Sequence, residues 1–357
     1  MCTKIILGWF WLGRLELSAD YTDYADFVLS GSVSDWGFLG SSKLSTQLHS
    51  FKVSLCNLCN LRMNLVYVSR LMNFRILGIV AILLIASLIT LGQEAAAKAD
   101  KKDWIQLFNG RNLDGWTVKI AKHKLGENFG NTFRVEDGLL KVSYDQYDTL
   151  DGQFGHLFYK DKFSYYLIAV EYRFTGQQAK GAPEWAFRNN GIMVHSQSPE
   201  SMGLDQDFPT SIEVQLLGGD GVHDRPNGNV CTPGTNIVID GALYTPHCYQ
   251  LHAKTYHGDQ WVRVVAEVLG SERITHYVEG VPVISYTRPQ LGGDTKNPEF
   301  ARRAGELLSE GYIALQAESH PTEFRKVELL NLVGCMDRKA KNFKSYYVKA
   351  DNEKCVY

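Results

Sequence analysis

The stretch Ser211-Ile-Glu-Val-Gln-Leu-Leu217 alternates apolar and polar side chains along most of its length. Successive side chains of a β-strand point to opposite faces, so the apolar residues at 212, 214 and 216 share one face. Glu213 and Gln215 then share the other face. This pattern predicts a strand with one side in a hydrophobic core and carboxyl and amide groups on the opposite side.

Short strands of this kind recur from residue 103 to about residue 332. Phe133–Val142 reads as a hairpin with Asp137-Gly138 at its turn. Only Pro298–Ser309 reads as a helix. Many short strands between turn signals predict an all-β protein, with residues 103–332 forming a jelly-roll β-sandwich of two antiparallel sheets.

Composition bounds the class of protein. A length of 357 residues suggests about two units at ~150 residues each, although one sandwich can fill much of that length. The formal net charge of -2 and the pI near 6.6 argue against a nucleic-acid partner, because such proteins carry an excess of basic residues. Aromatic residues make up 12% of the chain, and its 32 glycines favour a turn-rich β protein.

The segment that begins at Met72 has the layout of a secretory signal peptide. Asn73-Phe-Arg75 starts a positively charged region, an apolar run follows to Leu91, and small residues near Ala97 suit a signal peptidase. We therefore expect residues 72–99 to be a signal peptide, residues 100–102 a linker, and the mature protein to be secreted or periplasmic, without a stable membrane span. An uncleaved N-terminal anchor is the alternative. Residues 1–71 read as an over-extended gene model, or else as a genuine extension of unknown role.

Four cysteines remain after the expected cleavage: Cys231, Cys248, Cys335 and Cys355. An even number of cysteines in an exported protein suggests two disulfides. Pairing of nearest neighbours would join Cys231 to Cys248 and Cys335 to Cys355, and two other connectivities stay open.

Residues 333–357 read as a small appendix bracketed by cysteines. Its Asp and Asn side chains are hard oxygen ligands that could bind calcium, although a solvated loop without an ion is the favoured reading. No cofactor is assigned with certainty, and a divalent metal ion stays an open alternative.

Two further strands add polar groups to those of residues 211–217. Gly191–His195 presents His195, and Gly311–Glu318 presents Gln316 and Glu318. Together with Trp185 and His320 in neighbouring loops, these groups predict a sugar-binding groove, since sugar hydroxyls need hydrogen-bonding partners and sugar faces pack on aromatic rings. Ordinary solvent-exposed positions are the alternative.

A conventional retaining glycosidase is a weaker reading. It needs two carboxylates ~5–5.5 Å apart, and laminarinase-like sandwiches supply them from one strand, whereas Gln215 stands where the first Asp would be. A pair from different strands, Glu213 with Glu318, keeps this alternative open. A serine hydrolase has little support because no Gly-x-Ser-x-Gly motif occurs.

The segment Trp104-x-x-Leu-Phe-Asn-Gly-x-x-Leu-Asp-Gly-Trp116 resembles the opening signature of the 3-keto-disaccharide hydrolase family. The resemblance continues in order over most of 103–332, through Phe133–Gly138, Gly155–Leu157, Glu171–Phe174, Asn190–Ile192, Glu213–Gln215, Trp261, Gly311–Gln316 and Phe324-Arg325. The tail separately resembles a short Gly-Cys-x-Asp-x-x-Ala-x-Asn-Tyr module of exported bacterial proteins, with Phe343 in place of the usual Tyr.

The resemblance implies a concanavalin A-like jelly roll and an exported enzyme that cleaves glycosides already oxidised at C3. A ketone at C3 acidifies the proton on C2, so one base can remove that proton and the C1 leaving group can depart by elimination, with water added afterwards. Such chemistry needs a base, a group that stabilises the enolate, and an acid for the leaving group.

The resemblance also suggests roles for individual residues. Asn190, Glu213, Gln215, Gln316 and Arg325 match motif positions that would face the groove. Histidine titrates near neutral pH, which makes His195 a candidate base and His156 its alternative. Glu213 could orient that histidine, act as base or hold a metal, and Arg325 could stabilise the enolate. We therefore expect a 3-keto-glycoside hydrolase or lyase acting on an oligosaccharide or glycoside, with a non-catalytic carbohydrate-binding module or the Glu213–Glu318 glycosidase as alternatives.

Overall fold

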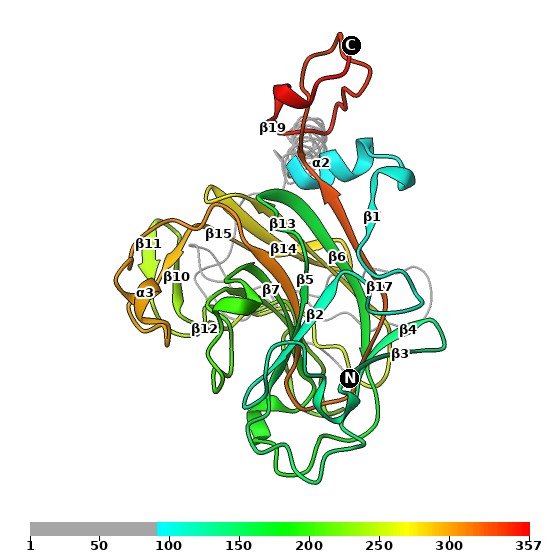
Figure 1. Cartoon of the computed structure of the whole chain (residues 1–357), viewed down its shortest axis with the longest axis vertical. Coiled ribbons are helices and arrows are strands. Elements are labelled where there is room, and N and C mark those ends of the chain that lie inside the picture. The colour runs from blue at the N-terminus through cyan, green and yellow to red at the C-terminus, as the bar shows by residue number, and fades with distance from the viewer. Residues whose placement is uncertain (1–90) are drawn as a thin grey trace, which may run out of the picture. The chain divides into compact units, whose positions relative to one another are not determined.

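The structure, a computed structural model, describes residues 91–357. The expectations for residues 1–71, and for the signal peptide as far as residue 90, lie outside the described part of the chain. Two large antiparallel sheets pack face to face in the described part, which confirms the jelly-roll β-sandwich (Figure 1).

The larger sheet, called sheet I, has ten strands in the order β11-β10-β15-β14-β13-β6-β17-β4-β3, with β1 also pairing with β17. Its strands are β1 Ile105–Gln106, β3 Phe133–Glu136, β4 Leu139–Val142, β6 Tyr165–Phe174, β10 Thr235–Ile239, β11 Ala242–Tyr244, β13 Val262–Leu269, β14 Arg273–Val278, β15 Val281–Leu291 and β17 Thr322–Asn331.

The second sheet, called sheet II, has seven strands in the order β12-β9-β8-β7-β16-β5-β2. Its strands are β2 Trp116–Ile120, β5 Gly155–Tyr159, β7 Asn189–Ser196, β8 Ile212–Leu217, β9 Val230–Cys231, β12 Cys248–Tyr249 and β16 Tyr312–Ala317.

The predicted hairpin of residues 133–142 is confirmed. β3 pairs with β4 from Phe133 opposite Val142 to Glu136 opposite Leu139. Asp137 and Gly138 both have positive φ, at 55° and 76°. Positive φ at both central residues is the geometry that a two-residue hairpin needs, and Asp-Gly adopts it readily.

Among residues 91–357, helices are few and short. The helices are α2 Leu91–Lys98 and α3 Pro298–Ala301, with 3-10 turns η1 Lys101–Asp103, η2 Phe129–Asn131, η3 Glu184–Ala186, η4 Pro199–Ser201 and η5 Asn352–Lys354. The prediction of a helix over 298–309 is therefore wrong beyond its first turn, because Gly305 adopts φ 87° and the chain returns to pair with β15. No helix among residues 91–357 is long and apolar enough to span a membrane.

The hydrophobic core lies between the two sheets. Ile212, Val214 and Leu216 of β8 are fully buried in it, together with Ile192 of β7 and Leu315 of β16. Burying each such side chain is worth roughly 1.5–3 kcal/mol. The same alternation turns Glu213 and Gln215 to the face of sheet II that points away from the core, as the sequence predicts.

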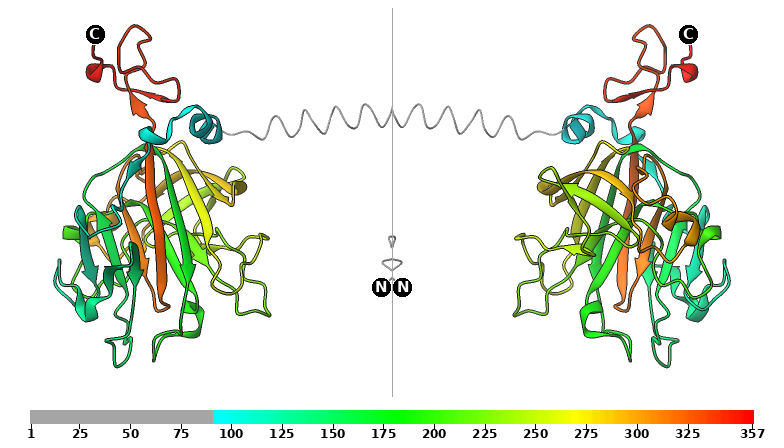
Figure 2. Two further views of the ribbon diagram at one scale, coloured as in Figure 1. Left: turned by 90° about the vertical axis from the view of Figure 1, so that its right-hand side faces the viewer. Right: turned by 90° about the vertical axis from the view of Figure 1, so that its left-hand side faces the viewer.

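The C-terminal appendix follows β17 directly, as the side views show (Figure 2). Its strands β18 Val333–Gly334 and β19 Lys349–Ala350 pair in parallel. Disulfides join Cys335 to Cys355 and Cys231 to Cys248, which confirms the nearest-neighbour pairing. Tyr346 of the appendix packs in a small cluster with Leu332 and with Ala95 of α2.

Candidate active site

A cavity of about 610 Å³ opens on the outward face of sheet II. That volume lies within the range of ~300–1,000 Å³ usual for small-molecule sites. Its walls combine acidic, amide, basic and aromatic side chains. The lining residues are Trp185, Asn189, Phe208, Glu213, Gln215, Leu217, Arg225, Cys231, His247, Cys248, Gln250 and Glu318.

Glu213 lies on β8, an interior strand of sheet II, and lines this cavity. Its side chain leans over Gly191 of the neighbouring strand β7, where a Cβ atom would lie 2.6 Å from Oε1 of Glu213. A glycine at position 191 therefore leaves the space that the carboxyl group occupies. Oε1 has no hydrogen-bond partner among the described residues, and burial raises the pKa of Glu213 to about 8.

Glu318 is the second carboxyl group of the cavity. It follows the last residue of β16, and the next residue is held firmly: Ser319 donates a hydrogen bond of 2.8 Å to the carbonyl of Ala186 and accepts one of 3.0 Å from Gln178. Burial raises the pKa of Glu318 well above its ordinary value, the charge of Glu213 raises it further, and Arg225 opposes both. Burial and the mutual repulsion of their charges therefore both favour the protonated forms of these two carboxyl groups.

Amide side chains line the wall beside Glu213. Gln215 donates to Oδ1 of Asn189 at 3.3 Å, and its own carbonyl accepts from Asn229 at 3.1 Å. Asn229 also donates to Gln250 at 3.1 Å. This chain of hydrogen bonds holds the amides of β7, β8 and the edge of sheet II in fixed orientations, as recognition of sugar hydroxyls requires.

Polar side chains of sheet II extend beyond the cavity onto β16, β5 and β2. Gln316 of β16 lies opposite His156 of β5, and His156 lies opposite Lys119 of β2. Gln316 and His156 are fully buried, and no described residue hydrogen-bonds either side chain. Burial and the charge of Lys119 lower the pKa of His156 to about 3, so this imidazole is neutral at physiological pH.

Aromatic rings close one side of the cavity. Phe208 contacts His156 edge-on, with ring centroids 5.9 Å apart, and stacks on Phe154 at 5.2 Å. Phe154 in turn lies 5.7 Å from Trp185, which is 54% exposed at the mouth. Trp185 therefore offers a partly exposed ring to a ligand, whereas Phe208 covers His156.

A comparison with protein families matches residues 103–330 to the 3-keto-alpha-glucoside-1,2-lyase-like domain. The chain belongs to this family. This is the 3-keto-disaccharide hydrolase family that the sequence motifs resemble, so the recognition is confirmed. Membership of this family supports a carbohydrate-related function for the domain of residues 103–330. A comparison with curated proteins returns no match.

Solved structures with similar folds come from several bacteria. A protein of Parabacteroides distasonis, provisionally described as a glycosyl hydrolase, is 16% identical with TM-score 0.40, over 64% of this chain and 99% of that one. A carbohydrate-binding module of Bacillus subtilis is 13% identical with TM-score 0.36, over 61% and 96%. A β-glucanase of Bacillus licheniformis is 12% identical with TM-score 0.35, over 64% and 97%.

Within the 3-keto-disaccharide hydrolase domain, Glu213, Gln215, Glu318 and Trp185 come together in the cavity, as the sequence predicts. Asn190 does not. It pairs with Leu216, shares the core-facing side of β7, and donates to Oγ1 of Thr322 at 3.3 Å. Its neighbour Asn189 takes the place in the cavity wall, because successive residues of a strand face opposite ways.

His195 also lies outside the cavity. Its backbone has φ 49°, which breaks the alternation of β7, and its Nε2 donates to the carbonyl of Gly270 at 2.9 Å. Burial lowers the pKa of His195 to about 4. The sequence argument placed His195 on the same side as Met193, and this placement fails because a left-handed residue changes the direction of the side chain.

Arg325 belongs to the outer face of sheet I. The register of β17 against β6 shifts between Phe324 and Lys326, so Arg325 is the extra residue of a bulge. Its Nε donates to Oε2 of Glu171 at 2.6 Å, and its guanidinium stacks 4.7 Å from the ring centroid of Trp261. The expectation that Arg325 reaches the groove is therefore corrected: sheet II carries the cavity, and Arg325 does not line it.

His320 lies near the cavity without lining it. Its ring packs edge-on against Phe187 at 5.1 Å and Phe174 at 5.7 Å. Burial, and then the charge of Arg188, lower its pKa to about 4. A neutral imidazole enclosed by aromatic rings is suited to packing the loop that follows Glu318.

Arg225, His247 and Phe208 line the cavity without having been predicted from the sequence. All three lie in loops, where no periodicity shows the direction of a side chain. The places of Asn189 and of the Cys231–Cys248 disulfide in the cavity wall could have been predicted. Asn189 shares parity with Gly191, and Cys231 lies opposite Glu213 across paired strands.

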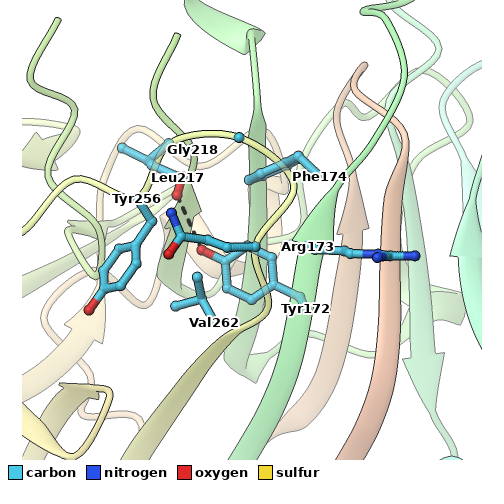
Figure 3. A pocket seen from close by; sticks show the side chains of 9 residues that line it. Tyr172, Arg173, Phe174, Leu217, Gly218, Tyr256 and Val262 are labelled. Atoms are coloured by element: carbon cyan, nitrogen blue, oxygen red, sulfur yellow. Dashed lines mark hydrogen bonds between the residues drawn. The ribbon is translucent and has the colours of Figure 1, made fainter. Parts of the chain in front are cut away.

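A second hollow lies beside the end of β8, with a volume of about 10 Å³ (Figure 3). It has room for about one water molecule and is too small for a sugar. Beside it, the hydroxyl of Tyr172 donates to the carbonyl of Leu217 at 3.2 Å, and Asn227 donates to the same hydroxyl at 2.7 Å. Asn227 also accepts from the amide of Leu217, so this end of the sandwich anchors the loop after β8.

A metal site has no support among the described residues. Residues 91–357 contain no group of three or more His, Cys, Asp or Glu side chains placed to hold a metal ion. In the appendix, Asp337 accepts hydrogen bonds from the amide of Lys339 and the hydroxyl of Tyr357 instead.

Proposed function

We propose that this protein is an exported enzyme that cleaves 3-keto-glycosides. The observation that carries the proposal is the pair of buried carboxyl groups, Glu213 and Glu318, in one cavity of sugar size. Membership of the 3-keto-alpha-glucoside-1,2-lyase-like family supports it.

The reaction begins with removal of the C2 proton by a carboxylate. The electrons of the C2–H bond move towards the C3 carbonyl, whose oxygen becomes an enolate. When the C3 carbonyl re-forms from the enolate, a double bond forms between C1 and C2 and the bond between C1 and the leaving oxygen breaks. The leaving oxygen takes a proton from an acid. Addition of water across the new double bond then gives the free 3-keto sugar. No covalent intermediate with the protein is needed.

Glu213 suits the base and Glu318 suits the acid. Burial alone raises the pKa of Glu213, whereas Glu318 carries the additional effect of the Glu213 charge. The first proton to leave the pair therefore comes from Glu213, and Glu318 keeps its own. A base with a pKa near the working pH combines a useful ionised fraction with strong proton affinity.

The remaining walls fit a sugar. Asn189, Gln215 and Gln250 offer amide groups held by hydrogen bonds, and Trp185 offers an exposed ring at the mouth. Export is supported by the two disulfides, which persist in oxidising compartments. We propose residues 72–99 as the signal peptide, 103–332 as the catalytic domain and 333–357 as the appendix.

A conventional glycosidase is the second candidate, because the same carboxyl pair could supply an acid and a nucleophile. Matched disaccharides, one oxidised at C3 and one unoxidised, separate the candidates when the purified protein is assayed with and without a chelator. We expect turnover of the oxidised sugar alone. Release of sugar from the unoxidised compound would establish the glycosidase, and glycan binding without any turnover would establish a binding module.

A further inference from the structure

Arg225 stands in the loop between β8 and β9 and lines the cavity with Glu213 and Glu318. It is the one arginine among the described residues that lines this cavity. The 3-keto chemistry places negative charge on a ligand oxygen, and neither carboxyl group supplies a positive charge to balance it. Arg225 is a cation in the cavity wall, and it is therefore a candidate partner for this oxygen.

Two hydrogen bonds fix Arg225, one through its backbone and one through its side chain. The backbone amide of Arg225 donates to Oγ1 of Thr255 at 2.7 Å, and Nη2 donates to the carbonyl of Trp185 at 2.8 Å. Two residues further on, Asn227 is fixed to Tyr172 and Leu217. The guanidinium is therefore preorganised, and none of the described residues hydrogen-bonds its Nη1 or Nε.

The charge of Arg225 interacts with that of Glu318 without forming an ion pair with it. Burial lowers the pKa of the guanidinium, and Glu318 and Asp220 oppose that effect. In return Arg225 lowers the pKa of Glu318. No ion pair in the described part of the chain joins Arg225 to either cavity glutamate, although all three side chains line the same cavity.

We propose that Arg225 binds the oxygen anion that forms at C3 when the C2 proton is removed, an inference that rests on the proposed function. As the C2–H bond breaks, the proton passes to Glu213 and the electron pair moves through C2 and C3 to the carbonyl oxygen. Arg225 donates an N–H hydrogen bond to that oxygen. C1 and C3 flank C2 in the sugar ring, so the acid acts at C1 and the cation at the oxygen on C3, while the base acts at the carbon between them.

The test replaces Arg225 by Met and by Lys, with Arg173→Met as the control. Arg173 is also a half-buried arginine, but it stacks on Trp261 on the outer face of sheet I and does not line the cavity of Glu213. Three quantities are measured: kcat, KM and the rate at which the C2 hydrogen of a 3-keto-glucoside exchanges with deuterium from solvent. The exchange rate reports enolate formation without loss of the leaving group.

We expect Arg225→Met to lower both kcat and C2 exchange by about 10²–10³-fold, which is the usual effect of removing one donor to an oxyanion. Arg225→Lys should fall between this variant and the wild type, and Arg173→Met should retain the wild-type rates. Added guanidinium ion should restore part of the exchange in Arg225→Met but not change the wild type. Such rescue would exclude a merely structural role even if the variant is less stable.

The outcomes separate this inference from the proposed function. If the wild type exchanges and cleaves the 3-keto-glucoside while Arg225→Met keeps its exchange rate, the Arg225 inference is overturned and the function stands. If Arg225→Met loses activity only on substrates with a carboxylate, the residue binds a substrate acid and the enolate role is wrong. If the wild type does not act on the oxidised sugar, the proposed function itself fails.

Discussion

The outer face of sheet I and the cavity face of sheet II carry similar residues in opposite states. On sheet I, Glu171 accepts from Arg263 at 3.0 Å and from Arg325 at 2.6 Å, and Glu323 pairs with Arg173 at 2.7 Å. On sheet II, Glu213 and Glu318 each keep an oxygen without a hydrogen-bond partner among the described residues.

This difference distinguishes a structural surface from a candidate site. Glu171 and Glu323 on sheet I are neutralised by arginines on adjacent strands, so little of their charge remains for a ligand. Burial of unpaired polar atoms in the cavity is unfavourable to folding, because each such atom has lost water without gaining a partner. We infer that the missing partners are groups of the substrate.

The largest expected effect comes from Glu213→Gln. The substitution keeps the shape of the side chain and removes the base, so kcat on a 3-keto-glucoside should fall by about 10³–10⁴-fold, at the upper end of the range for general base catalysis. The matched control is Glu171→Gln on sheet I, which should retain turnover although it breaks three ion pairs. Equal losses of activity in both variants would remove the distinction between the faces.

Glu318→Gln should have a smaller effect that depends on the leaving group. Loss of the acid should lower kcat by about 10²-fold for an alkyl leaving group and much less for a nitrophenol, which leaves readily as an anion. The ratio of the two rates in wild type and variant is the measurement. A uniform loss with both leaving groups would show that Glu318 is not the proton donor.

The raised pKa of Glu213 also predicts a pH dependence of stability. Between pH 4.5, its ordinary value, and about 8, the folded chain holds a proton that the unfolded chain has released. The free energy of unfolding therefore falls as pH rises through this window, by up to about 1.4 kcal/mol per pH unit.

Glu213→Gln carries no such proton, so its stability relative to wild type should grow up to about pH 8 and then level off. Denaturant unfolding at several pH values measures this difference. A constant difference between pH 5 and 8 would mean that the carboxyl group titrates normally.

The smallest expected effect is that of Arg325→Met. The exposed ion pair with Glu171 is worth about 0–1 kcal/mol, and the residue lies on the sheet that lacks the cavity. Turnover should stay near the wild-type value while the unfolding midpoint falls slightly. A loss of kcat comparable with that of Arg225→Met would favour the role that the sequence motif suggests for Arg325.

Period-two alternation predicted the cavity face wherever a strand is regular. It placed Glu213 and Gln215 on the face opposite the core, and the structure brings both into the cavity. It failed where the backbone departs from regular geometry. His195 has a left-handed conformation, and Arg325 stands at a bulge, so neither points where simple alternation indicates.

Period-two alternation does not predict where the side chains of loop residues point. Arg225 reaches the cavity because Thr255, Trp185 and the anchored Asn227 hold its loop, and these contacts join segments far apart in the sequence. No local pattern records such contacts. The sequence of Pro298–Ser309 reads as a helix, but the returning chain pairs with β15 and the helix ends after one turn.

The bond between Cys231 and Cys248 has a practical consequence for any assay. β12 is a two-residue strand at the edge of its sheet, flanked by His247 and Gln250 of the cavity wall. Cys231 also stands opposite Glu213, so the cross-link fastens this rim to the strand next to the proposed base. Dithiothreitol in the preparation would reduce this disulfide and release the rim from β9. A low rate measured on such protein would reflect the reduced disulfide and not the activity of the native enzyme.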